Sequence, residues 1–152
     1  MKKILVMFFC LLGFAVFAQE ALFMDKLIFE KESTMEDLVT LYSYLINDKF
    51  SDNLKNYDAN LKYLKDKFKY FPKETSPTKK VTVGDFSLLT IQYLKIESGL
   101  FYLATRNGRY ATRELLSRNI IPFNTSEYDY ISGLDLVSYL QKVVSYEETL
   151  KN

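Results

Sequence analysis

Residues 82–94 read TVGDFSLLTIQYL, and the same pattern stands at two other places in the chain. Residues 34–45 read TMEDLVTLYSYL, and residues 132–140 read SGLDLVSYL. Each copy has Ser or Thr, two further residues, Asp, and then apolar residues at the i, i+3, i+4 spacing of an amphipathic helix. A hydroxyl residue followed three positions later by an acid is typical of a helix N-terminal capping box. The pattern predicts three capped helices, with the cap residues Thr34, Asp37, Thr82, Asp85, Ser132 and Asp135.

Two further stretches have apolar residues at helical spacing, and each ends close to a proline. Pro72 and Pro122 each precede the next cap hydroxyl by ten residues. Proline stops a helix and restricts the residue before it, so each of these helices should end there. We therefore expect an all-α fold of about five helices, with Gly99 just beyond the end of the third. Their expected ranges are 34–46, 53–71, 82–96, 109–120 and 132–148.

The repeating unit is thus a helix, a proline-containing loop and a capped helix. It occurs fully twice, with an extra capped helix at the front. The expected organisation is a signal peptide at 1–18, an N-terminal helical unit at 19–72, a flexible linker at 73–80 and a C-terminal helical unit at 81–152.

The first 18 residues have the form of a secretory signal. Lys2 and Lys3 precede an apolar stretch over 4–18, which is shorter than the roughly 18 residues that a membrane-spanning helix needs. Small residues at its end predict cleavage before Gln19, and retention as an uncleaved anchor is the alternative. Cys10 follows a phenylalanine, which excludes a lipoprotein signal. The protein is therefore expected to be exported, to the periplasm.

Composition excludes several classes of function. The 152 residues include no His and one Cys, and 20 basic residues balance 19 acidic ones. Lack of His removes the usual general base and the commonest metal ligand, and near-neutral charge disfavours nucleic-acid binding. Calcium is disfavoured because Tyr128 and Asp129 stand where an EF-hand loop needs a ligand oxygen and Gly. We expect no enzyme activity, metal, cofactor or small-molecule substrate.

All four arginines lie within thirteen residues, close to a tyrosine, and a loop with two further tyrosines follows. The planar guanidinium suits carboxylates, phosphates and sugars, and tyrosine rings stack on sugars. These residues are the candidate partner- or glycan-binding site: Arg106, Arg109, Tyr110, Arg113, Arg118, Tyr128 and Tyr130. The structural alternative is that Arg109 and Arg113 pair with Asp85, Glu114 or Asp135, or are merely solvated.

Residues 110–121 (YATRELLSRNII) followed by 131–140 (ISGLDLVSYL) resemble an S-layer homology module. Residues 81–86 (VTVGDF) are similar to the "ITRAEF" helix start of a preceding module. The resemblance covers 81–146 well and 33–72 weakly. It implies tandem all-helical modules that dock on cell-wall polysaccharide. The family's Trp before Ala is absent, and Val83 and Gly133 replace the "TRAE" arginine, one of its ligand contacts. The composition also resembles that of small periplasmic proteins of spirochaetes.

Two functions remain open at this point. The first is a non-catalytic periplasmic scaffold or adaptor that binds an envelope or flagellar protein. The second is a wall-binding module that contacts peptidoglycan or attached polysaccharide through the arginine-rich helix and the facing loop. Because the family's arginine is missing, the sequence favours the first.

Overall fold

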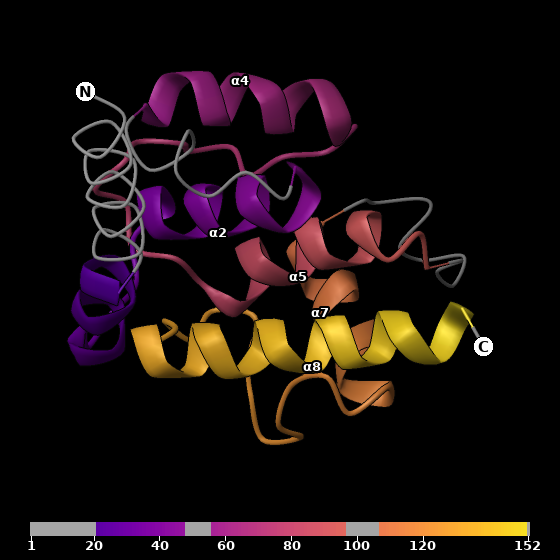
Figure 1. Ribbon diagram of the computed structural model, residues 1–152. Helices are drawn as coiled ribbons and strands as arrows, with labels where there is room; N and C mark the ends of the chain where they lie inside the picture. The colour runs from indigo at the N-terminus through magenta and orange to yellow at the C-terminus, as the bar shows by residue number, and fades with distance from the viewer. Residues whose placement is uncertain (1–20, 48–55, 97–106, 152) are drawn as a thin grey trace, which may run out of the picture.

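The computed structural model describes residues 21–47, 56–96 and 107–151. Within these ranges the chain forms helices and loops, with two isolated β-bridges and no β-strand. The helices are residues 21–29, α2 (Met35–Asn47), α4 (Tyr57–Lys67), α5 (Val83–Tyr93), α7 (Gly108–Ser117) and α8 (Gly133–Lys151). The expected all-α fold is confirmed (Figure 1).

The three helices α2, α5 and α8 begin with the cap chemistry of the repeated pattern. At α5, the backbone N–H of Asp85 donates to Thr82 Oγ1 at 3.2 Å, and the N–H of Thr82 donates to Asp85 Oδ2 at 3.1 Å. In the other two pairs, Thr34 with Asp37 and Ser132 with Asp135, the N–H of the acid likewise donates to the cap hydroxyl. These bonds satisfy N–H groups that have no partner inside the helix.

The segments just before these three helices close into a ring of backbone hydrogen bonds. The N–H of Ser33 donates to the carbonyl of Ile131 at 2.7 Å. The N–H of Val81 donates to Ser33 at 2.9 Å, and the N–H of Ile131 donates to Val81 at 3.1 Å. Each residue gives one bond and takes one, and all three are buried. The three copies are therefore related by an approximate threefold axis.

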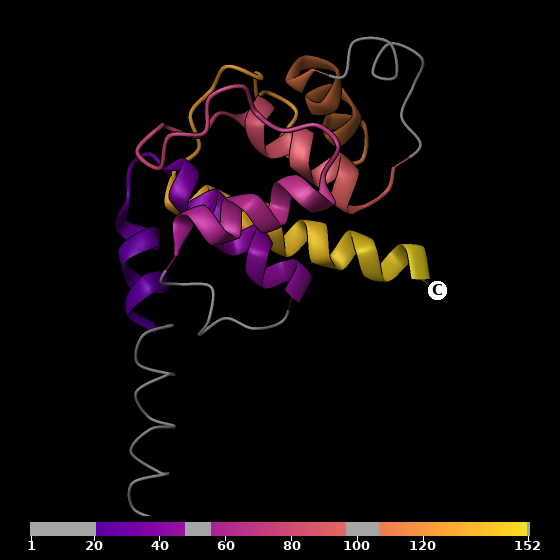
Figure 2. The ribbon, with the colours of Figure 1, turned by 90° about the horizontal axis from the view of Figure 1, so that it is seen from above.

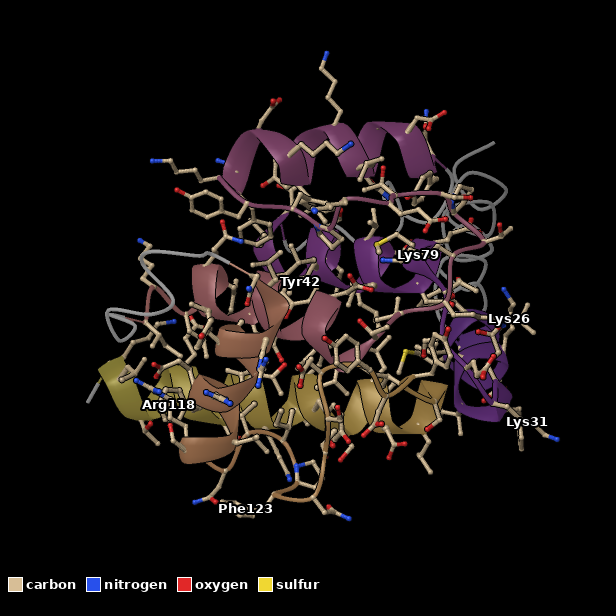
Figure 3. All side chains as sticks on the ribbon, turned by 180° about the vertical axis from the view of Figure 1, so that it is seen from behind. Lys26, Lys31, Tyr42, Lys79, Arg118 and Phe123 are labelled. Carbon is tan, nitrogen blue, oxygen red and sulfur yellow. The ribbon has the colours of Figure 1, made fainter. Side chains whose placement is uncertain are left out.

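From this ring, α2, α5 and α8 run in the same general direction and share one core (Figure 1). Tyr42 of α2 lies at its centre, where its hydroxyl bonds to Thr90 Oγ1 of α5 at 2.5 Å (Figure 3). Its ring contacts Phe68, Phe86 and Tyr93 at centroid distances of 6.1–6.3 Å. Full burial raises the pKa of Tyr42 far above its ordinary value. The two helical units expected from the sequence thus share a single core.

Shorter helices cover the capped helices from outside. α4 packs on α2, and α7 packs on α5. Residues 21–29, which the sequence analysis did not predict as a helix, contact the start of α8 (Figure 2). There, a Cβ added at Gly133 would lie only 1.6 Å from the carbonyl oxygen of Leu27, so only glycine permits this approach. The front capped helix is therefore also preceded by a helix, although no proline lies between the two.

The expected helix over 53–71 is wrong at its C-terminus, because α4 ends at Lys67. Phe68 adopts an extended conformation with φ −105° and ψ 126°. The side-chain amide of Gln92 accepts from the N–H of Tyr70 at 2.8 Å and donates to its carbonyl at 2.6 Å. This side chain from α5 takes the place of helical bonding, so the chain leaves the helix before Pro72.

Two other helix ends were also placed too late. α5 ends at Tyr93 rather than 96, and Lys95 takes the left-handed conformation (φ 51°). Gly99, which was expected just beyond the helix, lies outside the described residues. α7 ends at Ser117 rather than 120, with Asn119 left-handed (φ 57°). In both cases an amide beyond the helix donates back across the last turn, Ile96 to Ile91 and Ile120 to Leu115. α8, by contrast, continues to Lys151, beyond the expected 148.

Residues 73–80, expected to be a flexible linker, lie against the start of α2. The carbonyl of Lys79 accepts the N–H of Met35 at 2.8 Å, and that of Pro77 accepts the N–H of Glu36 at 3.1 Å. The segment thus closes the N-terminal end of α2. No helix in the part of the chain described here is both long and apolar enough to cross a membrane.

Candidate functional site

A groove of about 810 Å³ opens where the starts of α5 and α7 meet two loops. We call it the polar groove. One loop precedes α5, and the other precedes α8. The side chains that border it include Lys73, Glu74, Asn107, Arg109, Glu127 and Tyr128. It lies between two copies of the repeat, so its shape depends on how the copies pack.

Two glycines bring the walls of the polar groove together. A Cβ added at Gly108 would lie 2.8 Å from the carbonyl oxygen of Gly84, so the lack of a side chain at Gly108 allows the two helix starts to lie close together. The N–H of Gly84 donates to the carbonyl of Glu127 at 2.9 Å, which fixes the second loop beside them. Asn107 caps α7 by accepting the N–H of Tyr110 at 3.3 Å. Local cap chemistry and close backbone approach therefore position Arg109 and Glu127.

Two ion pairs border the polar groove. Arg109 Nε lies 3.7 Å from Glu127 Oε1, and the arginine side chain remains 57% exposed. Lys79 Nζ makes a closer ion pair with Asp85 Oδ2, at 2.8 Å, with both side chains largely buried. Lys79 is thus held by its partner in the lining of the groove, whereas the side chain of Arg109 is more exposed.

The structure brings only some of the candidate residues predicted from the sequence to the polar groove. Arg109 and Tyr128 border the polar groove. Arg113 instead lies over the ring of Tyr110, with 5.5 Å from its guanidinium carbon to the ring centroid. Arg118 pairs with Glu114 at 2.5 Å. Tyr130 is 59% exposed and forms an isolated β-bridge with Thr82, and Arg106 lies outside the described residues.

The arginines therefore do not all serve one recognition face. Figure 3 places Arg118 far from Lys79, at the other side of the view. The acid that Arg109 pairs with is Glu127, which was not among the expected partners. Lys73 and Glu74 were assigned to a linker, and nothing in their local sequence signalled a groove.

Val83 and Gly133, which the resemblance to S-layer homology modules aligns with the "TRAE" arginine, lie inside the protein. Val83 is 1% exposed. Gly133 lies directly against Leu27. Neither Val83 nor Gly133 lines the polar groove.

Among the residues that the structure describes, no three His, Cys, Asp or Glu side chains gather into a group that could hold a metal ion. Comparison of the chain with protein-family models, with curated proteins and with solved structures finds no match. The candidate site is therefore described from the structure alone.

Proposed function

We propose that this protein is a non-catalytic module of the cell envelope that binds an anionic polysaccharide in the polar groove. The observation that carries the proposal is the rim of the groove, where Arg109 and Lys73 are exposed beside the 77% exposed ring of Tyr128. Together they offer cationic donors and an aromatic face at one opening.

These groups match the chemistry of a charged glycan. The guanidinium of Arg109 can donate to a carboxylate or phosphate through two parallel N–H bonds. The ring of Tyr128 can cover the apolar face of a sugar. Glu74 and Glu127 border the same groove and can accept bonds from sugar hydroxyls. Its volume of about 810 Å³ falls within the range of about 300–1,000 Å³ found for ligand pockets.

The resemblance to S-layer homology modules supports the same class of ligand, since those modules dock on cell-wall polysaccharide. The signal-like first 18 residues support a place in the periplasm, where peptidoglycan and its attached polymers lie. Both remain predictions, and residues 1–20 lie outside the described part of the chain.

A scaffold or adaptor that binds an envelope or flagellar protein is the second candidate function. A different surface favours it, an apolar groove between α2 and α8. The two functions use separate surfaces and are separable by mutation.

Co-sedimentation with purified sacculi tests the proposal. We expect the protein to pellet with sacculi and the double variant Arg109→Ala/Tyr128→Ala to lose at least tenfold in apparent affinity. Arg118→Ala is the matched control, because it removes the same charge from the end of the same helix, away from the groove. Raising the salt concentration should weaken the binding of the wild-type protein.

Sacculi stripped of their attached polysaccharide show which polymer is the ligand. Binding that persists on stripped sacculi indicates peptidoglycan, and binding that is lost indicates the attached polysaccharide. No sedimentation with either preparation, or equal sedimentation of the double variant and the wild type, would contradict the proposal.

A further inference from the structure

A second groove, which we call the apolar groove, lies between α2 and α8 and has a volume of about 610 Å³. Leu41, Tyr44 and Leu45 form its α2 wall, and Val137, Leu140 and Val144 form most of its α8 wall. Met24 of the helix at 21–29 closes one end. No residue that lines it carries a charge.

The approximate threefold axis relates the residues of α8 that line this groove to equivalent residues of α2 and α5. The caps Thr34, Thr82 and Ser132 are equivalent, so α2 positions map to α5 by adding 48 and to α8 by adding 98. The counterparts of Val137 are therefore Val39 and Ser87, which are both 0% exposed. Val144 is 36% exposed, whereas its α5 counterpart Leu94 is 6% exposed. The face that is covered on α5 is open on α8.

In the other two copies a helix and the residues after it provide the cover. α4 packs on α2, and Phe68 just beyond its end meets Tyr42 at a centroid distance of 6.1 Å. α7 packs on α5, where Thr112 Oγ1 donates to the buried Ser87 Oγ at 3.2 Å. α4 and α7 each end fifteen residues before the next cap hydroxyl.

The third copy lacks this cover within the described residues. The helix at 21–29 ends only five residues before Thr34, too close to include an equivalent of Phe68 and the loop after it. It reaches the N-terminal end of α8 through Leu27 and Met24. The remaining length of the α8 face, from Val137 to Val144, stays open as the apolar groove.

We propose that the apolar groove binds an amphipathic helix of a partner protein, in the place that α4 takes on α2. The partner helix has apolar residues at i, i+3 or i+4 and i+7, and an apolar residue just beyond its C-terminus, as α4 has Phe68. This interaction goes beyond polysaccharide binding and does not depend on it, because the two grooves share no lining residue.

The charges disfavour a second copy of this chain as the occupant. α4 and α7 are already packed through buried side chains such as Leu64 and Leu115. The helix at 21–29 exposes Leu22 and Phe29, but Asp25 and Lys26 lie between them on the same face. Docking that face would bury two charges in an uncharged groove, which is costly without partners.

A fluorescein-labelled peptide of residues 56–72 is the probe, because it carries α4 and Phe68, the segment that fills the equivalent position on α2. We expect saturable binding to the full-length protein in a fluorescence anisotropy titration, with a micromolar Kd. Val144→Glu in the protein should weaken binding at least tenfold, because it places a charge in the groove. Phe123→Glu is the matched control: Phe123 is 88% exposed and projects from the loop after α7 (Figure 3).

Circular dichroism melts establish that both variants remain folded. Absence of saturable binding, equal binding of a peptide with scrambled sequence, or equal losses in both variants would overturn the proposal. A dimer in analytical ultracentrifugation that Val144→Glu abolishes would also overturn it, in favour of a second copy as the occupant.

Discussion

At the residue scale, Glu30 shows how the contact between two copies constrains a titratable group. Its backbone carbonyl accepts the N–H of Gly133 at 3.0 Å, which holds the residue at the junction of two copies. Its carboxylate lies 3.3 Å from Lys26 Nζ, and that lysine is 66% exposed. Partial burial and then the negative charge of the buried Asp37 raise the pKa of Glu30. Ionised Glu30 is therefore less favourable in the folded protein than in the unfolded chain.

Glu30→Gln should raise the stability of the protein at neutral pH, by about 1 kcal/mol or less. Because its pKa is raised, Glu30 binds a proton more tightly in the folded protein than in the unfolded chain. Wild-type stability is therefore highest below the ordinary glutamate pKa, where Glu30 is protonated in both states. This stability is lost as the pH rises through the raised pKa of Glu30 in the folded protein. Glutamine removes this loss, so the variant and the wild type should converge in acid and diverge above it.

Urea unfolding from pH 4 to pH 8 measures this difference directly. A variant that is less stable than the wild type at pH 7 would mean that the exposed ion pair with Lys26 outweighs the repulsion from Asp37.

At the element scale, helix starts and helix ends differed in how well the sequence predicted them. The starts of α2, α5 and α8 follow from hydroxyl and acid side chains that act within one turn, so local sequence was sufficient. The end of α4 depends on Gln92, a residue on another helix, and apolar spacing alone extends past it. The helix at 21–29 was not predicted, because residues 19–29 contain no Ser or Thr that could begin the repeated cap pattern.

Close approach between elements gives the sharpest prediction at this scale. Gly133→Ala should destabilise the fold by several kcal/mol, because the new Cβ would lie 1.6 Å from the backbone carbonyl of Leu27. The helix at 21–29 would have to move away from α8. Leu134→Ala is the control, because this neighbouring side chain is 58% exposed and should change stability by about 0.5 kcal/mol or less.

Thermal or urea unfolding of the two variants checks this prediction. Equal stability of Gly133→Ala and the wild type would show that the contact between α8 and the helix at 21–29 is not tight in solution.

At the scale of the whole molecule, the candidate site could be predicted only in part. Arg109 and Tyr128 were predicted as binding residues from their chemistry, and both border the polar groove. The bond from Gly84 to Glu127 brings the loop that carries Tyr128 beside α5, and it depends on the packing of two copies. Lys73 reaches the same groove from a segment that the sequence marked only as a linker. Nearness in sequence also grouped Arg118 with Arg109, although the helix carries them to different places.

The closed ring of backbone hydrogen bonds joins the three copies into one fold. If the ring forms, the amides of Ser33, Val81 and Ile131 open only when the whole protein unfolds. Native-state hydrogen exchange followed by NMR measures each of them. We predict that the three amides have the same free energy of opening within about 1 kcal/mol, equal to that of global unfolding. A Ser33 amide that exchanges hundreds of times faster than those of Val81 and Ile131 would show that the first copy is not joined to the other two, and would contradict the threefold arrangement.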